Sequence, residues 1–248
     1  MQTAYFNSLT RCLLEKGCIH HKYCPHLIRE IFELVEVQVL KNEPALLKLT
    51  TPMNICGDIN GHYHDLLRIF RTIGTPAKHR YLFLGNYTDH IGNNSSPLLH
   101  SFHLIILQSL PIAAVLANKI FCVHGGLINK IERLDHIKKL EPDEKPVLMK
   151  LMPTTGESNR NLSESIDDDI DNKLSEFGVD CIIRGHQVVN GYLLCRGGRV
   201  IILYSASSLH QSFNNLAAIA KISESLEFHS TKRTTNTTEF EKRQISKF

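Results

Sequence analysis

Short apolar runs alternate with amphipathic segments through the middle and the C-terminal half of the chain. The runs are rich in Ile, Leu, Val and Tyr, as buried strands are. They occupy residues 53–56, 81–84, 119–123, 181–184, 192–195 and 200–204. Between them, residues 63–72 and 165–177 carry apolar side chains at helical spacing. Strands that alternate with helices predict a layered α/β domain.

The first part of the chain has a different period. Ile28, Ile31 and Val35 recur at helical spacing, so residues 5–49 are predicted to be mainly helical. With 248 residues, 42% of them hydrophobic, the chain is long enough for one domain with a full core. We therefore expect a single domain over residues 1–228.

The last twenty residues, 229–248, are polar and basic. They hold five Lys or Arg and two Glu, so their charge is +3. This equals the formal net charge of the whole chain, and the charges of residues 1–228 therefore sum to zero. A neutral body lacks the concentrated basic face that nucleic-acid binding requires. We expect a disordered tail and no nucleic-acid partner.

Cysteine use and hydropathy bear on the compartment. The seven cysteines are odd in number and form no Cys-x-x-Cys pair, which favours reduced thiols in the cytosol or the nucleus. Residues 104–123 are the most apolar window, but Gln, Ser, Pro, Asn and Lys interrupt it. This window is predicted to be core, and no membrane association is expected.

Four loops that follow predicted strands carry donor atoms, and each contains glycine. Strand ends converge at one edge of a layered α/β protein, where sites are usually built. The loops are GDING with Asp58 and Asn60, GNYTDH with Asn86 and Asp89, VHGG with His124, and RGHQ with His186. Their order and spacing predict one shared site.

The segments ICGDING, YLFLGNYTD, KIFCVHGGL and IIRGHQVVNGY resemble the metal-dependent serine/threonine phosphoprotein phosphatases, most closely the type 1 catalytic subunit. The resemblance runs from about residue 9 to about residue 228. It implies a calcineurin-like α/β fold, with a central β-sandwich flanked by helices. It also implies two divalent ions at one edge and hydrolysis of phosphoserine and phosphothreonine.

The resemblance assigns roles to five residues that match the family's motifs. Asp58 matches a ligand of the first ion, and His124 and His186 match ligands of the second. Asp89 matches the acid that orients a catalytic histidine. Arg160, in TGESNR, matches a phosphate-binding arginine.

The chain departs from the family at several of these places. Asn60 stands where the family has a metal-binding His, and Asn86 replaces the Asp that bridges both ions. His90 replaces a phosphate-binding Arg. Only 27 residues lie between Gly92 and Ile120, so the middle is shortened and the Gly-Asn-His-Glu loop, with its Asn ligand and general-acid His, is absent.

These losses bear directly on metal binding and turnover. Two divalent ions about 3.7 Å apart repel by about 18 kcal/mol at an effective dielectric of about 20, and neutral Asn86 cannot offset that repulsion. Loss of a general acid costs about 10²–10⁴-fold in rate. We expect at most one divalent ion, Mn, Zn or Fe, held by His124 and His186 with Asn86 and Asp58.

Two alternatives stay open for these side chains. The histidines could merely hydrogen-bond within a loop edge that no longer binds an ion, and Asp58 could cap the helix predicted at residues 63–72. For the protein as a whole, one hypothesis is a phosphatase-like protein without turnover that binds regulatory subunits or phosphoproteins. The other is a weak phosphatase that uses one ion and Arg160. A third possibility is a shortened chain that does not fold stably.

The resemblance also points to a surface for protein partners. In type 1 phosphatases a hydrophobic groove takes an extended peptide from regulatory subunits as an added strand. Matching positions here are Ile120, Cys181, Leu194, Leu226 and Phe228. Glu227 puts a charge into that strand, and packing in the core is the alternative role for all five.

Overall fold

The computed structural model describes residues 43–87, 110–125, 131, 133–138, 140, 170–207, 215–233 and 238–244. Every structural statement below concerns these residues. Asp89, His90 and Arg160 lie outside them, as do residues 1–42.

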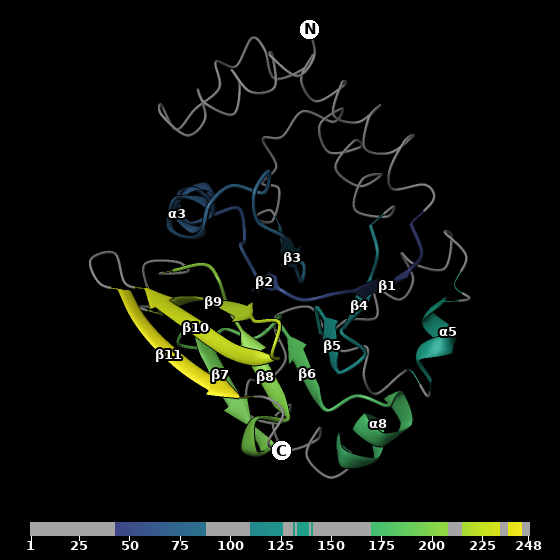
Figure 1. The fold of residues 1–248 in the computed structure, drawn as a ribbon. Coiled ribbons are helices and arrows are strands. Elements are labelled where there is room, and N and C mark those ends of the chain that lie inside the picture. The colour runs from purple at the N-terminus through teal and green to yellow at the C-terminus, as the bar shows by residue number, and fades with distance from the viewer. Residues whose placement is uncertain are drawn as a thin grey trace, which may run out of the picture.

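Two β-sheets form the centre of the described structure (Figure 1). The six-stranded sheet has the order β1 (Leu46–Leu49), β4 (Ala113–Leu116), β5 (Ile120–Val123), β6 (Cys181–Arg184), β8 (Val200–Leu203), β7 (Tyr192–Cys195). The five-stranded sheet has the order β11 (Thr238–Gln244), β10 (Glu227–Arg233), β9 (Ala217–Ile222), β2 (Met53–Cys56), β3 (Tyr81–Phe83). The strands predicted from the apolar runs are confirmed.

The two sheets pack face to face over a shared core. Ile55 and Phe228 of the five-stranded sheet lie in one buried cluster with Ile183 and Leu203 of the six-stranded sheet. All four side chains are at most 1% exposed. Burying such aliphatic and aromatic side chains contributes about 1.5–3 kcal/mol each, so this layer contributes strongly to stability.

Helices cover the outer faces of both sheets. Helices α5 (Leu134–Lys138) and α8 (Ile170–Phe177) pack on the six-stranded sheet, where the Phe177 ring meets Phe121 edge-on at 5.3 Å. Helix α3 (Tyr63–Ile73) packs on the five-stranded sheet through Ile69, which joins Cys56 and Ile219. A 3-10 turn, η5 (Arg196–Gly198), links β7 to β8. The result is a β-sandwich between helical layers.

Strand direction determines where the loops gather. β2 and β3 run parallel, as do β5, β6 and β8. At the point where the sheets meet, Asp58 forms a parallel bridge with Tyr204, which joins the loop after β2 to the end of β8. The loops that follow β2, β3, β5 and β6 therefore converge at one edge of the sandwich.

Two sequence-based predictions are wrong in the described part of the chain. The predicted helical region 5–49 ends in a strand, because Leu46–Leu49 pairs with β4 as an edge strand. The predicted disordered tail instead supplies most of β10 and all of β11, with His229 opposite Lys242. Backbone hydrogen bonds to the neighbouring strand hold such a mostly polar strand in place, and composition does not reveal that pairing.

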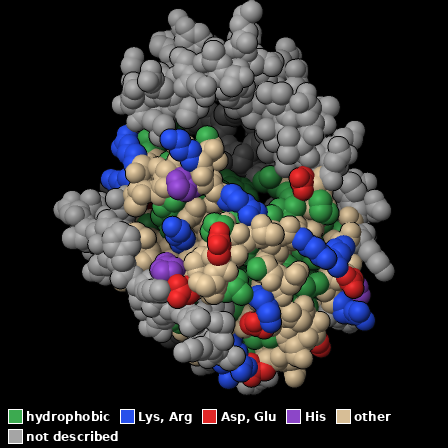
Figure 2. Space-filling view, viewed as in Figure 1, with side chains coloured by type: hydrophobic (Ala, Val, Ile, Leu, Met, Phe, Trp, Pro, Cys, Tyr) green, Lys and Arg blue, Asp and Glu red, His purple; other side chains and the backbone are tan. Residues whose placement is uncertain are grey.

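No helix in the described ranges is both long and apolar enough to cross a membrane. On the face shown in Figure 2, the described Lys and Arg side chains are interspersed with Asp and Glu.

Candidate metal centre

Three of the four predicted loops bring one carboxylate and two imidazoles together, and the fourth adds Asn86. Asp58 follows β2, His124 follows β5 and His186 follows β6. Potential ligand atoms of these three residues all lie within 4.8 Å of one another. Asp58 is 2% exposed, so its charge is held almost out of water.

Both oxygens of Asp58 accept hydrogen bonds within the site. The backbone N–H of His186 donates to Oδ1 at 2.9 Å, and the side-chain amide of Asn86 donates to Oδ2 at 2.9 Å. The N-cap of α3 is His62. The alternative that Asp58 caps this helix is therefore wrong, and the carboxylate belongs to the site.

The two histidines contact each other directly. His124 Nε2 lies 3.0 Å from His186 Nδ1, so one of these nitrogens carries the shared hydrogen. The rings meet edge to face, with their centroids 4.8 Å apart. His186 adopts a φ of 66°, in the left-handed region that histidine occupies more often than most non-glycine residues do.

One nitrogen of this pair has no hydrogen-bond partner among the described residues. His124 Nδ1 is buried and lies 3.6 Å from Asp58 Oδ1, which is too far for a hydrogen bond. Two ligands of one tetrahedral ion, each at about 2.1 Å from it, lie about 3.4 Å apart. The orphaned nitrogen and the carboxylate therefore fit a shared divalent ion.

The two asparagines occupy different positions around this group. Asn86 presents its amide N–H to Asp58, and its backbone oxygen accepts from the N–H groups of Ile59 and Asn60. The Asn60 amide donates to the hydroxyl of Tyr204 at 2.6 Å. Both residues have positive φ, 48° at Asn60 and 49° at Asn86, which asparagine tolerates better than most side chains. Asn86 thus acts as a donor to the carboxylate that was predicted to bind metal.

Two glycines allow these side chains to approach one another. A Cβ atom at Gly185 would lie 2.4 Å from Asp58 Oδ1, and one at Gly85 would lie 2.8 Å from the His124 ring. Either contact is too short for a real side chain, so the motifs require glycine at both places.

A buried cation behind the site was missed by the sequence analysis. Arg184 is 3% exposed and donates to the side chain of Gln187 at 2.7 Å and to the backbone oxygen of Gly185 at 3.2 Å. Burial lowers the pKa of Arg184, and Cys195 and Asp58 oppose that shift. A charged residue at the end of the apolar run IIR was the available signal.

Burial also makes the site sensitive to acid. It lowers the pKa of His124 below the usual 6.5, with smaller effects from its neighbours. The His124 side chain binds a proton more readily in the unfolded chain than in the folded protein. The contribution of neutral His124 to stability is therefore present above pH 6.5 and is lost as pH falls below it. We expect the free energy of unfolding, measured by urea titration with EDTA, to decrease between about pH 7.5 and about pH 5.5. His124→Gln should flatten that decrease, whereas a control His136→Gln, at an exposed position of α5, should not.

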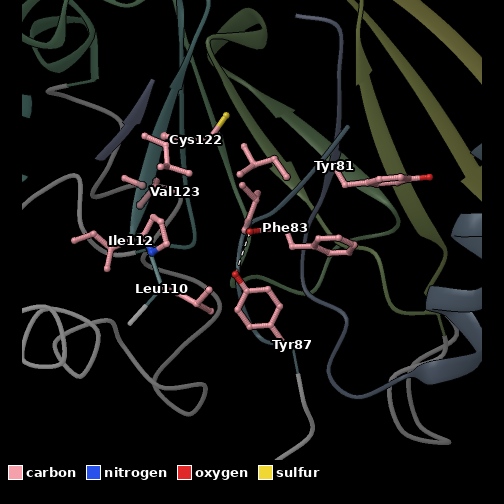
Figure 3. Close-up of a pocket in the computed structure, with 13 residues that line it drawn as sticks. Tyr81, Phe83, Tyr87, Leu110, Ile112, Cys122 and Val123 are labelled. Atoms are coloured by element: carbon pink, nitrogen blue, oxygen red, sulfur yellow. Dashed lines mark hydrogen bonds between the residues drawn. The ribbon is translucent and has the colours of Figure 1, made fainter. Parts of the chain in front are cut away.

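An apolar pocket lies beside the site, between β3 on one side and β4 and β5 on the other. Its volume is about 470 Å³. Phe83 and Tyr87 line one side of it, and Ile112 and Val123 line the other (Figure 3). The Tyr87 hydroxyl donates to the Phe83 backbone oxygen at 3.3 Å, and burial raises the pKa of Tyr87 to about 12. This phenol is therefore neutral at physiological pH.

The predicted peptide groove is largely inside the protein. Ile120, Cys181 and Phe228 are at most 1% exposed and lie in the core between the sheets. Leu194 and Leu226 are partly buried against the same core. Only these last two could touch a docked peptide, and the far edge of β10 is already paired with β11.

Comparisons with known proteins agree with this architecture. The family model described as calcineurin-like phosphoesterase matches residues 92–190. A solved structure of a protein serine/threonine phosphatase from Saccharomyces cerevisiae, with similarity to human phosphatase PP5, superposes with a TM-score of 0.68 at 20% identity. That match covers 98% of this chain and 96% of the yeast chain.

A cold-active protein-tyrosine phosphatase from a Shewanella species is also similar. Its TM-score is 0.54 at 13% identity, over 80% of this chain and 82% of that one. At these identities the structural matches establish the fold. The chain has the calcineurin-like metallophosphoesterase fold that its sequence predicted.

Proposed function

We propose that this protein is a serine/threonine phosphatase-like protein that holds at most one divalent ion and has little or no turnover. Its main role is to bind phosphoproteins or phosphatase regulators. The observation that carries this proposal is the hydrogen bond from the Asn86 amide to Asp58 Oδ2. A donor occupies the place where a second metal ion would need a bridging anion.

The charge of the cluster supports a single ion. The ligand group holds one carboxylate, on Asp58, and two imidazoles that are neutral when they bind metal. One divalent ion leaves a net charge of about +1, whereas two leave about +3 and add a mutual repulsion of about 18 kcal/mol at a dielectric of about 20. The buried Arg184 adds a further positive charge nearby.

The chain's own residues define what such a site can do. Asp58 and His124 Nδ1 would hold the ion, with His186 as the third ligand. A bound ion with an open position polarises a phosphoryl oxygen and lowers the pKa of bound water. The His186 N–H and the Asn86 amide hold the Asp58 carboxylate in one orientation. Positive charge at this edge would attract a phosphorylated side chain.

Residues predicted to complete the catalytic machinery have no described position. We retain Asp89, His90 and Arg160 as candidates for contacts to phosphate, on the strength of the resemblance alone. Weak phosphatase activity is the second candidate function, and the orphaned nitrogen of His124 favours it because that atom fits an ion. A site that holds one ion without a general acid is expected to be slow by about 10²–10⁴-fold or more.

Metal content measured beside turnover tests the proposal. The full chain is loaded with Mn²⁺ or Zn²⁺, and bound metal and phosphopeptide hydrolysis are measured on the same sample. We expect no more than one ion per chain, and none in the double variant His124→Ala/His186→Ala. The control is His79→Ala/His136→Ala, which removes two exposed histidines and should keep the ion.

Turnover separates the two candidate functions. Hydrolysis by the wild type no faster than by the double site variant, with phosphopeptide binding retained, supports the binding role. Metal-dependent hydrolysis above that background favours the weak enzyme. Two tightly held ions with fast turnover would contradict both.

A further inference from the structure

We propose that Asp65 is a positioning residue that sets the orientation of the Asp58 carboxylate through the segment Tyr204–Ser207. Asp65 lies in the first turn of α3, where an acidic side chain usually stays in water and stabilises the helix dipole. Here it is 5% exposed. The inference extends the proposed metal centre, and part of its test needs no metal.

Asp65 uses its carboxylate to hold a segment 142 residues away in the sequence. The backbone N–H of Ser207 donates to Oδ2 at 2.8 Å, and the Ser207 hydroxyl lies 2.9 Å from the same oxygen and 3.0 Å from Oδ1. Arg68 donates to Oδ1 at 3.0 Å, and His62 Nδ1 lies 3.5 Å from Oδ2. Hydrogen bonds to a buried charged group are about twice as strong as neutral ones, so this is a firm attachment.

The attached segment is in turn bonded to the metal loop. The Ser205 N–H donates to the Asp58 backbone oxygen at 3.1 Å, and the Ser205 hydroxyl accepts from Gly57 N–H at 2.9 Å. That hydroxyl donates onward to the Ala218 backbone oxygen at 2.6 Å. The Tyr204 hydroxyl accepts from Asn60 at 2.6 Å. Three residues of the loop that carries Asp58 are therefore bonded to this one segment.

These contacts close a ring around the base of the site. The loop from Gly57 to Asn60 runs directly into α3, α3 is bonded through Asp65 to Ser207, and the residues before Ser207 return to the loop. The ring leaves the Asp58 backbone little freedom to move. Residues that hold a metal ligand in position through hydrogen bonds typically cost about 10–100-fold in metal affinity when they are removed.

The test compares Asp65→Asn and Asp65→Glu with a destabilised control. Leu174→Ala in α8 creates a cavity in the core on the outer side of the six-stranded sheet, away from the ring. Each full-length variant is titrated with Co²⁺ against a chelator, and its thermal unfolding is recorded. We expect Asp65→Asn to weaken Co²⁺ binding by about 10–100-fold, Asp65→Glu to recover part of that loss, and Leu174→Ala to bind as the wild type does despite a lower melting temperature.

A second measurement needs no metal. The backbone amide of His186 donates to Asp58 Oδ1, so its proton chemical shift and its hydrogen exchange report the position of that carboxylate. In the metal-free protein we expect Asp65→Asn to shift this resonance and speed its exchange, and Leu174→Ala to leave both unchanged. If Asp65→Asn fails to fold, Ser207→Ala, which removes the hydroxyl but keeps the backbone donor, is used with the same readouts.

The outcomes separate the inference from the proposed function. Unchanged Co²⁺ affinity together with an unchanged His186 amide in Asp65→Asn would overturn the positioning role. If the wild type binds no Co²⁺, the single-ion site is overturned, and the His186 amide alone decides whether Asp65 positions Asp58. If Leu174→Ala changed the His186 amide by as much as Asp65→Asn does, this would also count against the inference, because the change would then reflect a general loss of stability.

Discussion

Replacing Asn86 with Asp and Asn60 with His should convert the protein from holding at most one divalent ion to holding two. The carboxylate introduced by Asn86→Asp would supply the bridging anion that offsets a repulsion of about 18 kcal/mol at a dielectric of about 20. The histidine introduced by Asn60→His would give the first ion a second protein ligand beside Asp58. Histidine is among the residues that tolerate the left-handed backbone, which suits the φ of 48° at position 60.

The same double variant should behave in opposite ways with and without metal. In the metal-free protein the new carboxylate would lie against Asp58, where Asn86 now donates at 2.9 Å, so the free energy of unfolding should fall. With Mn²⁺ in excess, the ions bind only the folded variant, so its free energy of unfolding should rise above that of the metal-loaded wild type. Metal per chain is measured by elemental analysis, and unfolding by urea titration with and without EDTA.

A charge-matched control distinguishes the site from a general effect. Asn190→Asp adds one negative charge at an exposed position whose oxygen accepts from Leu216 N–H, a contact that the carboxylate can keep. It should change neither the metal content nor the difference between the free energies of unfolding measured in EDTA and in Mn²⁺. Phosphopeptide hydrolysis in the double variant should rise at least about 10-fold, still limited by the missing general acid. No gain of metal would show that geometry, not charge, limits the site.

Sequence patterns predicted the parts of this fold that are specified locally. Strands β2, β5, β6 and β8 are buried on both faces, so each is mostly apolar, with Asn54 and Arg184 as the polar exceptions. The glycines and donor residues that follow them are equally local, which is why the sequence alone placed Asp58, His124 and His186 at one edge. Buried strand ends have few alternative arrangements in a layered α/β domain.

Features that depend on partners distant in the sequence could not be predicted in this way. The segment Leu46–Leu49 has no local feature that distinguishes a strand from a helix, and pairing with β4 decides it. β11 is mostly polar, and it forms a strand because it pairs with β10. The role of Asp65 depends on Ser207, which lies 142 residues further along the chain.

Substitution of Gly57 by Ala should have the largest effect on stability of any change considered. Gly57 lies where the loop after β2 crosses the end of β8. A Cβ atom there would lie 2.0 Å from the Leu203 backbone oxygen and 2.6 Å from its carbonyl carbon. The obstacle is backbone at the junction of the two sheets, so no side-chain rotation relieves it. We expect a loss of more than about 4 kcal/mol in the free energy of unfolding, a large part of the total for one domain.

Gly178→Ala is the matched control, because it isolates backbone strain from steric overlap. Gly178 has a φ of +63°, and a Cβ atom there would have nothing within 4 Å. An alanine at Gly178 should cost only the left-handed penalty of about 1–2 kcal/mol. Urea unfolding of both variants, followed by circular dichroism, measures the two losses. If Gly57→Ala were no more destabilised than Gly178→Ala, the two sheets would not meet at Gly57 as described, and the close approach of Asp58 to Tyr204 that supports the metal loop would be wrong as well.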